Sequence, residues 1–558
     1  MDRLISATLD NVIRLCAADH YDYIVIGSGI GGGVLARSLV EDEKGDPKPR
    51  VLLIERGGLL LNTHCTNIAS PRWHQESLEG PSMDNAMVYD ELKGSFATVT
   101  SRSSEYVGGP VYGIGGRSTV WGLYTPMLAK SQLASFPAET RDYLNEEHYN
   151  KAYKLMTNDR GASITKPYPW LEYNVSDNTI AAFNRIRQKL NQSFPGGVDK
   201  EKFEPCPMAA EFTAREPGSR LYQTVMGGYS TTAWILEQAF NKSEYLNLLS
   251  RTRVVAINRA QPECQSNRVE SLTVLDDRGK ERIIPTRNAT VILCAGTIDT
   301  ATIALRSGLG ENKFVGCGLT DHDIWGTRFI FRGGFTVNRI NGQALRLQRM
   351  VKMKAVPETC GGEIDCLVNI TINAPSFLGR DGDFPTQHIN MKNEKVSEVQ
   401  FMKEEAEALE RTGTPTDKVM IQVVYCFPSA LIDDNRVLNL PKPEATIQIS
   451  KIDTSMYIHD MECLASRIMK QLRDPWAPGE QPPRVSRAPF GVVAHEVGTM
   501  RMGECREKSV VDNDLRVHGW ENLFVCDLSV FPISPSSNPS ITLAALAQRL
   551  AQHLKQKW

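Results

Sequence analysis

A histidine and an asparagine near the C-terminus have the side chains best suited to act together on a substrate. His495 begins the polar turn His495-Glu496-Val497-Gly498-Thr499, and Asn538 lies in the later dipeptide Asn538-Pro539. An imidazole can accept the proton of an alcohol near neutral pH, because its unperturbed pKa is about 6.5. An amide can hold the alcohol oxygen. If a hydride acceptor lies on the other side of the carbon that carries the hydroxyl, such a pair can oxidise the alcohol.

Two elements must bring this pair together. The apolar run Asn522–Cys526 predicts a short buried strand that ends at Asp527, and the apolar periodicity of Ile541–Leu554 predicts a helix. Asn is favoured as an N-cap and Pro as a first helical residue, which places Asn538 at the positive end of that helix. The alternative is that Asn538 only caps the helix and that His495 only makes local hydrogen bonds within its turn.

A nucleotide-binding motif stands at the other end of the chain. The strand-like run Tyr21–Ile26 leads directly into Gly27-Ser28-Gly29-Ile30-Gly31-Gly32, and a helical pattern follows. Glycines in this context allow backbone to approach a pyrophosphate at the helix N-terminus. A second strand, Val51–Ile54, ends at Glu55, whose carboxylate can accept hydrogen bonds from a ribose. This unit predicts a dinucleotide site without separating NAD from FAD.

A glycine-rich segment, residues 106–127, reads YVGGPVYGIGGRSTVWGLYTPM. Its bare backbone can lie against a flat ligand, with Trp121 as a wall. A flexible loop is the alternative, although Pro, Tyr and Trp favour a packed one. Further strand-like runs occur at Leu248–Val255 and Ala289–Leu293, followed by CAGTIDTATIALRSGLG and VGCGLTDH.

Composition limits the classes of function. The 63 basic and 65 acidic residues give a net charge of −2, which offers no electrostatic case for binding nucleic acid or an anionic membrane. The 12 cysteines show no CxxC spacing, so we expect neither a disulfide framework nor a metal site. No signal peptide and no 18-residue apolar stretch is visible, which predicts a soluble, cytoplasmic protein.

Four motifs in the same order resemble the glucose–methanol–choline (GMC) oxidoreductase family of FAD-binding flavoproteins. They are GSGIGG with Glu55, the GGRST loop, the GTIDTATIALRSGLG segment with VGCGLTDH, and the C-terminal His495/Asn538 run from Val492 to Leu554. The GGRSTVW sequence and the His/Asn pair look most like the pyranose 2-oxidase branch. The motifs cover about a third of the chain.

The resemblance implies a set of FAD contacts. Relatives that attach flavin covalently have histidine where this chain has Val120, so non-covalent FAD is expected. Gly122 stands where that branch has threonine near the reactive edge of the flavin, which leaves oxygen reactivity and sugar specificity open. The expected cofactor-binding residues are Gly27, Ser28, Gly29, Ile30, Gly32, Glu55, Arg56, Gly116, Arg117, Ser118, Val120, Gly122, Val254, Ala295, Asp527, Leu528 and Pro539.

The resemblance also implies an α/β fold: a Rossmann-like FAD-binding domain (the GMC fold) with a second, α+β substrate domain. Strand-like runs between Thr327 and Ile452 predict that this second domain is built on a mainly antiparallel sheet. The charged segment 379–418, with a helix-like stretch near Val399–Leu409, is expected to be either a solvated surface excursion or a lid at the mouth of the site. The predicted boundaries are 20–165, 216–323 and 486–558 for a discontinuous FAD domain, 166–215 for a substrate-domain excursion, and 324–485 for the substrate domain.

The function that follows is the oxidation of an alcohol to a carbonyl, with His495 and Asn538 as catalytic residues. His495 accepts the hydroxyl proton, hydride passes to flavin N5, and the helix after Pro539 stabilises the negative charge that develops. His322 and His518 are expected to be structural. Glu496 is left out of the site, because adjacent residues seldom face each other.

Several alternatives stay open at this stage. A flavin-containing lyase and a flavin-binding protein without redox work fit the same motifs. The substrate is expected to be a cyclic secondary alcohol, either a pyranose or a hydroxylated natural product. The electron acceptor can be O2, a quinone or a protein, so oxidase and dehydrogenase are not separated. The sequence does not indicate an oligomeric state.

Overall fold

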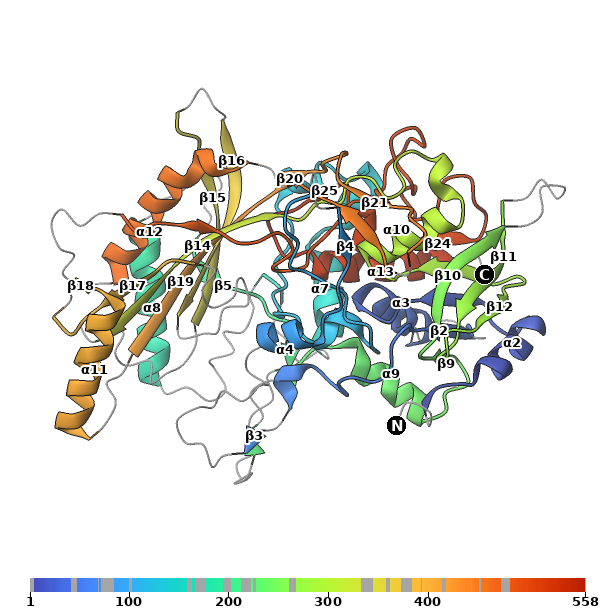
Figure 1. Cartoon of the computed structure of the whole chain (residues 1–558), viewed down its shortest axis with the longest axis horizontal. Helices are drawn as coiled ribbons and strands as arrows, with labels where there is room; N and C mark the ends of the chain where they lie inside the picture. Colours follow the sequence, from blue (N-terminus) through green and yellow to red (C-terminus); the bar gives the residue numbers. More distant parts are fainter. Residues whose placement is uncertain are drawn as a thin grey trace.

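Two sheets lie at opposite ends of an elongated molecule (Figure 1). The structure is a computed structural model. It describes residues 5–41, 48–68, 70–71, 85–99, 103–157, 163–165, 177–193, 202–211, 222–223, 227–259, 267–332, 345–357, 362–372, 384–392, 394–413, 418–442, 444–450, 453–472 and 482–556.

The first sheet is parallel and buried on both faces. In spatial order its strands are β24 (Leu523–Val525), β13 (Thr290–Leu293), β1 (Tyr23–Ile26), β2 (Val51–Ile54) and β9 (Leu246–Leu249). Every residue of β1 and β2 is buried, which explains why these strands read as continuous apolar runs. The carboxyl ends of the strands share one edge, where ligands of such sheets bind.

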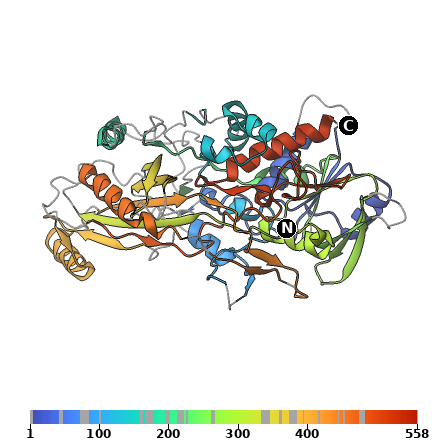
Figure 2. The same cartoon turned by 90° about the horizontal axis from the view of Figure 1, so that it is seen from above.

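Two helices from the two ends of the chain pack together against this sheet. They are α3 (Ile30–Glu41) and α13 (Ser540–Gln556), which lie side by side (Figure 2). The N-terminal segment forms α2 (Leu9–Ala17), where the Thr8 side chain accepts a hydrogen bond from the Asn11 amide. The large core around the sheet therefore joins residues that are more than 500 positions apart.

One predicted strand, Leu248–Val255, is wrong. The chain turns at Arg251, whose φ of +54° lies in the left-handed region, and the run divides between two sheets. Its first part belongs to β9. Its second part begins β10 (Arg253–Arg259), which pairs antiparallel with β11 (Val269–Leu275), and β11 pairs with β12 (Glu281–Pro285).

The second large sheet is mainly antiparallel, as predicted. Its order is β18 (Lys395–Val396), β17 (Thr386–Ile389), β14 (Asp323–Arg332), β19 (Lys418–Phe427), β16 (Glu363–Ile372), β15 (Leu345–Lys354) and β5 (Glu204–Pro205), with β23 (Ser486–Arg487) paired to β14. Only β14 and β17 are parallel among these described strands. The predicted run Thr446–Ile452 does not join it: β22 (Thr446–Gln448) pairs with β21 (Arg436–Leu438) and β4 (Ala97–Thr98).

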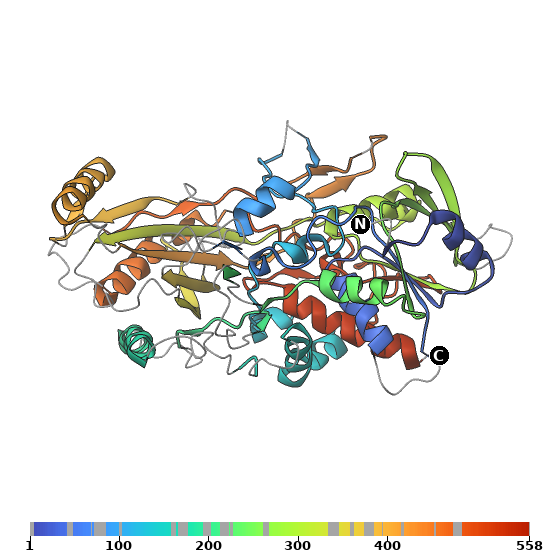
Figure 3. The ribbon, with the colours of Figure 1, turned by 90° about the horizontal axis from the view of Figure 1, so that it is seen from below.

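Helices α8 (Asp177–Ser193) and α12 (Ile458–Leu472) pack together and supply a second core with the large sheet (Figure 3). The described part of segment 379–418 contains the predicted helical stretch near Val399–Leu409, and none of its residues lines the cavity described below. It forms β17, β18 and α11 (Glu398–Thr412), and α11 lies at the outer end of the molecule (Figure 1). Residues 379–383 and 414–417 lie outside the described residues.

The remaining elements are short or connect the sheets. They are η1 (Cys65–Asn67), β3 (Ser70–Pro71), α4 (Asn85–Leu92), η2 (Gly116–Thr119), α5 (Lys130–Leu133), α6 (Ala138–Tyr143), α7 (Glu146–Met156), β6 (Ala210–Glu211), β7 (Tyr222–Gln223), β8 (Gly227–Gly228), α9 (Thr231–Phe240), α10 (Thr297–Arg306), η4 (Leu309–Glu311), β20 (Ser429–Ala430), η6 (Ser455–Tyr457), η7 (Leu528–Val530) and β25 (Ile533–Ser534). The five-part domain division stays a prediction, and much of 166–215 lies outside the described residues.

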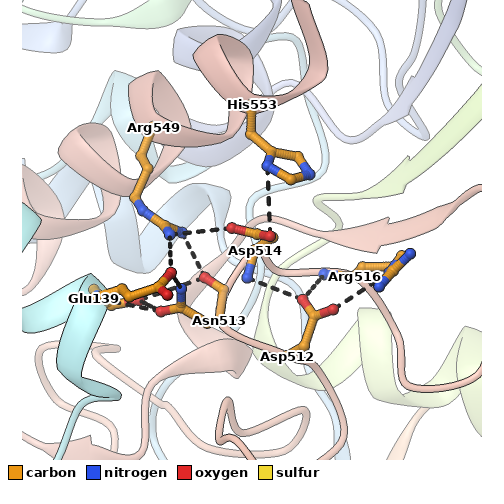
Figure 4. Close-up of polar contacts among 8 residues, drawn as sticks. Glu139, Asp512, Asn513, Asp514, Arg516, Arg549 and His553 are labelled. Atoms are coloured by element: carbon orange, nitrogen blue, oxygen red, sulfur yellow. Dashed lines mark hydrogen bonds and ion pairs between the residues drawn. The ribbon is translucent and has the colours of Figure 1, made fainter. Parts of the chain in front are cut away.

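A polar cluster fixes the C-terminal half of α13. The Arg549 guanidinium donates to the Asn513 carbonyl and lies 3.1 Å from Asp514 Oδ1 and 3.8 Å from Glu139 Oε2 (Figure 4). One turn later, His553 Nδ1 lies 3.5 Å from Asp514 Oδ2. These contacts set the orientation of α13, and with it the position of Asn538 just before the helix.

Candidate active site

A cavity of about 250 Å³ opens at the carboxyl ends of the parallel strands and extends to His495 and Asn538. Of the predicted site residues, Gly32 and Pro539 do not line it. The others do: His495, Asn538, Gly27, Ser28, Gly29, Ile30, Glu55, Arg56, Gly116, Arg117, Ser118, Val120, Gly122, Val254, Ala295, Asp527 and Leu528. Residues from both ends of the chain therefore meet around one space.

The glycines after β1 divide into two kinds. An added Cβ on Gly32 would lie 2.0 Å from the Gly27 carbonyl oxygen, and one on Gly31 would lie 2.0 Å from the Cys526 carbonyl oxygen. These two glycines let α3 pack closely on the strands. An added Cβ on Gly29 would meet no atom within 4 Å, because Gly29 opens into the cavity. Gly32 therefore has a packing role, and its contact with a cofactor stays a prediction.

Glu55 lies on the cavity wall with its carboxylate already engaged. Oε2 accepts hydrogen bonds from the Ser28 amide at 3.1 Å and the Ser28 hydroxyl at 2.6 Å, and Oε1 accepts from the Gly57 amide at 2.9 Å. Burial raises the pKa of Glu55, and these hydrogen bonds oppose that rise. The Arg56 backbone amide is a further hydrogen-bond partner of this carboxylate, which is therefore held firmly at the cavity wall.

The glycine-rich segment 106–127 is packed against the first glycine turn. The Gly115 amide donates to Ser28 Oγ at 2.9 Å, and the Ser118 hydroxyl donates to the Gly115 carbonyl at 2.6 Å. Trp121 Nε1 donates to the Tyr229 carbonyl at 2.8 Å. The flexible-loop alternative is therefore excluded for the described residues 106–127.

Asp527, at the end of β24, ties the wall of the cavity together. Its Oδ2 accepts from the Gly296 amide at 3.0 Å and from the Thr300 hydroxyl, and its Oδ1 accepts from the Ser529 amide at 2.9 Å. Burial raises the pKa of Asp527, while the bonds from Ser529 and Thr300 oppose that rise. The carboxylate joins the start of α10 to the turn that precedes Asn538.

Asn538 is not the cap of α13. The first helical hydrogen bond runs from the Leu543 amide to the Pro539 carbonyl at 3.0 Å, so the cap position is Pro539. Among the described residues, the Asn538 side chain has no hydrogen-bond partner, although the residue is only 8% exposed and lines the cavity. The capping interpretation of Asn538 is therefore wrong, and its amide is free to bind a ligand. Pro539 itself does not line the cavity, and its contact with a cofactor stays a prediction.

His495 reaches the same cavity from a strained turn. Ala494, directly before it, has a φ of +52°, a conformation that costs a non-glycine residue about 1–2 kcal/mol. The His495 amide donates to Asp321 Oδ2 at 3.3 Å, and His495 Nδ1 lies 3.1 Å from His322 Nε2. Burial, His322 and the Arg117 guanidinium lower the pKa of His495 well below its usual value. The ring is therefore neutral at pH 7 and can accept a proton.

A buried ionic network holds the turn that carries His495. Arg117 donates to the Ala494 carbonyl and to Glu496 Oε2 at 2.8 Å, and the Tyr106 hydroxyl donates to Glu496 Oε1. Glu496 is 1% exposed, and its carboxylate points to Arg117 and Tyr106 instead of the His495 ring. Burial and Glu496 raise the pKa of Tyr106 well above its usual value.

Sequence reasoning missed several residues of this site. His322 was expected to be only structural, yet it contacts the His495 ring. Tyr106 lies in the glycine-rich segment without a motif to mark it. Asp299 accepts from Tyr112 at 3.0 Å and lies 3.3 Å from Arg56 on the cavity wall. His518 lies off the cavity, 2.8 Å from Ser509 Oγ.

None of the described helices is long and apolar enough to cross a membrane. In the described part of the chain, no three His, Cys, Asp or Glu side chains form a group that can hold a metal ion.

Comparisons with known proteins match this architecture. The N-terminal model of the GMC oxidoreductase family matches residues 94–324, and its C-terminal model matches residues 440–547. An oxygen-dependent choline dehydrogenase of Escherichia coli (strain SMS-3-5 / SECEC) is 26% identical over 96% of this chain and 95% of its own length. A dehydrogenase of Strobilurus tenacellus is 44% identical over 61 residues, which are 11% of this chain and 10% of that protein.

Two solved structures share the fold at 16% identity. A formate oxidase of Aspergillus oryzae RIB40 has a TM-score of 0.59 and covers 96% of this chain and 98% of its own. A pyridoxine 4-oxidase from Mesorbium loti has a TM-score of 0.55, with 96% and 99% covered. The two family models together match more than half of the sequence, on both sides of the cavity. The chain therefore belongs to the GMC oxidoreductase family, whose members are FAD-dependent enzymes that act on CH–OH groups.

Proposed function

We propose that this enzyme oxidises a cyclic secondary alcohol to a ketone, with FAD bound non-covalently in the cavity. The observation that carries the proposal is the placement of two unlike polar groups on the wall of one cavity. They are a neutral imidazole, His495, and an amide without a protein partner, Asn538.

The residues of the cavity fit FAD. Gly29 leaves space where an added Cβ would meet no atom within 4 Å, so its backbone can approach a pyrophosphate. The Glu55 carboxylate lies on the wall of the same cavity, where it can face a ribose hydroxyl. Val120 lines the cavity with an aliphatic side chain that cannot form a bond to the flavin, which supports non-covalent binding. FAD, when bound, supplies the hydride acceptor for the reaction.

The protein's own residues perform the proton chemistry. The substrate hydroxyl binds between His495 and Asn538, where the Asn538 amide donates a hydrogen bond to its oxygen and orients it. His495 removes the hydroxyl proton, and the loss of that proton lets the carbon release its hydrogen as hydride. The Ser540 amide at the start of α13 faces the same cavity, so the helix dipole stabilises negative charge there.

The walls near His495 favour a substrate with apolar surface. Val120, Trp121, Val492 and Val493 line the cavity beside the catalytic pair. A hydroxylated ring compound of natural-product type fits these walls better than a free pyranose, because burying sugar hydroxyls against aliphatic side chains leaves them without partners. Pyranoses remain the second substrate class, from the resemblance of GGRSTVW to that branch.

An anaerobic spectral titration tests the proposal. The purified protein is mixed with D-glucose, benzyl alcohol, cyclohexanol and hydroxylated terpenoids, and the oxidised flavin band is followed. We expect cyclic secondary alcohols to bleach the band and His495→Ala to abolish bleaching, whereas His20→Ala, a surface control, leaves it unchanged. Full bleaching in His495→Ala, or release of a carbonyl product without bleaching, contradicts the proposal.

Admitting air to the reduced protein then identifies the acceptor. We propose O2 as that acceptor, so the band is expected to return in air within the turnover time. A band that returns only after a quinone is added assigns the enzyme as a dehydrogenase.

A further inference from the structure

His322 contacts the His495 ring and the loop that leads to Asn538. Its Nδ1 is 2.8 Å from the Pro535 carbonyl oxygen, and its Nε2 is 3.1 Å from His495 Nδ1. Pro535 belongs to the loop that leads to Asn538. The His322 side chain is 1% exposed, so water does not compete for either nitrogen.

These two contacts determine where the protons lie. A carbonyl oxygen only accepts hydrogen bonds, so His322 Nδ1 must carry the hydrogen that it donates to Pro535. Burial lowers the pKa of His322 to about 4, and the ring is therefore neutral near pH 7, with a lone pair on Nε2. His495 Nδ1 must then carry the hydrogen shared with that lone pair. The remaining nitrogen of His495, Nε2, is left with the free lone pair.

We propose that His322 is a positioning residue that holds His495 as its Nδ1–H tautomer, so that Nε2 is the base that faces the substrate. The proposal rests on the proposed function of His495. The same acceptor continues to bind Nδ1–H after His495 has taken a proton, so His322 also stabilises the imidazolium.

No other described group competes for this role. The Asp321 carboxylate accepts the backbone amides of His322 and His495, and its Oδ1 is 3.9 Å from His322 Nε2, beyond a hydrogen bond. Glu496 is bound by Arg117 and Tyr106, and Asp323 by Arg487. A neutral histidine is thus the partner of the base.

His322 also links the position of the His495 ring to that of the loop before Asn538. His322 follows Asp321 just before β14, at a distance in sequence from both His495 and Asn538. By bonding the ring of one and the loop of the other, it fixes the separation between the proton acceptor and the amide. A shift of about 1 Å in such a separation is enough to slow catalysis strongly.

A matched pair of variants separates the two contacts. In His322→Gln the amide lies near the position of Nε2 and offers an acceptor to His495. In His322→Asn the amide lies near the position of Nδ1 and keeps only the donor to Pro535. His20→Asn, at the surface, controls for the loss of a histidine.

The first measurement is of the ring-nitrogen chemical shifts in FAD-loaded, deuterated protein with 15N-labelled histidine, assigned through His495→Gln. We expect protonated Nδ1 and unprotonated Nε2 for His495 at pH 7.5. The opposite tautomer overturns the proposal, and this test needs no His322 variant to fold.

The second measurement is the rate of anaerobic flavin reduction by the alcohol that bleaches fastest in the panel. We expect His322→Asn to lower the maximal rate about 100-fold with little change in KM. His322→Gln should stay within about 10-fold of the unmodified protein, at equal FAD content. Equal losses in both variants, or none in His322→Asn, overturn the proposal.

The proposed function and the proposed role of His322 are contradicted by different results. If His495→Ala retains flavin reduction, the proposed function fails whatever the tautomer is. If His495→Ala is inactive but His495 carries its hydrogen on Nε2, only the role of His322 fails.

Discussion

The Arg117 guanidinium and the Glu496 carboxylate form a buried ion pair at 2.8 Å that joins the glycine-rich segment to the catalytic turn. Arg117 also donates to the Ala494 carbonyl, so one side chain binds the residues on both sides of His495. The left-handed conformation of Ala494 is kept because these contacts offset its strain.

Breaking this pair should destabilise the protein. Arg117→Met leaves Glu496 buried without its cation, and we expect the free energy of unfolding of the apoprotein to fall by about 3 kcal/mol in urea titration. The double variant Arg117→Met/Glu496→Gln should recover part of this loss, because no unpaired charge remains. A double variant whose loss equals the sum of the single losses would show that the pair is not coupled.

Removing the Asn538 amide should affect catalysis and not folding. Asn538→Ala is expected to lower the maximal rate of flavin reduction about 100-fold, because a donor to the substrate oxygen is lost. Its free energy of unfolding should change by less than about 0.5 kcal/mol. The control is Ser397→Ala, which removes a side chain that does cap a helix, the first turn of α11, and should cost about 1 kcal/mol.

A moderate decrease in pH should not slow flavin reduction. His495 acts as a base only when it is neutral, and burial, His322 and Arg117 lower its pKa well below the usual value. The neutral form therefore persists below about pH 6.5, and the rate should stay level there and fall only at lower pH. Stopped-flow reduction across a pH series measures this. A rate that already declines between pH 8 and 7 would contradict a lowered pKa.

The two kinds of glycine after β1 should respond differently to alanine. Gly32→Ala places a methyl group against the Gly27 carbonyl and should lower the free energy of unfolding by about 1–3 kcal/mol. Gly29→Ala places it in the cavity, so the apoprotein should be as stable as before while FAD content falls. Equal FAD content in Gly29→Ala and the unmodified protein would exclude Gly29 from the cofactor site.

The flavin should leave the protein on denaturation. Acid precipitation is expected to release all of the FAD into the supernatant, since Val120 offers no atom for a covalent bond. Absorbance of the supernatant against that of the native protein gives the released fraction. Flavin fluorescence that stays with the protein on a denaturing gel would show a covalent link.

Sequence reasoning succeeded where a pattern is local. The strand, glycine turn and helix from Tyr23 to Glu41 need only residues that are neighbours in the chain. The large sheet was likewise visible as strand-length apolar runs. Arg251 shows the limit: nothing in its residue type indicates a left-handed turn, so the run around it was taken for one strand.

The candidate site was predictable only as a set of positions. Seventeen of the predicted residues line one cavity, but the contacts among them depend on packing. His322 and His495 are 173 residues apart, and no periodicity links them. The sequence Asn538-Pro539 is compatible with either residue as the N-cap of the helix. Only the hydrogen bond from the Leu543 amide to the Pro539 carbonyl shows that Pro539 is the N-cap.

The position of β24 at the edge of the parallel sheet has a consequence for biosynthesis. This strand, Asp527 after it and Asn538 all come from the last tenth of the chain, and they pair with β13 and with the Gly296 amide. A growing polypeptide on the ribosome thus exposes the unpaired edge of β13 until translation is nearly finished. The cavity is therefore complete only after β24, Asp527 and Asn538 have been synthesised.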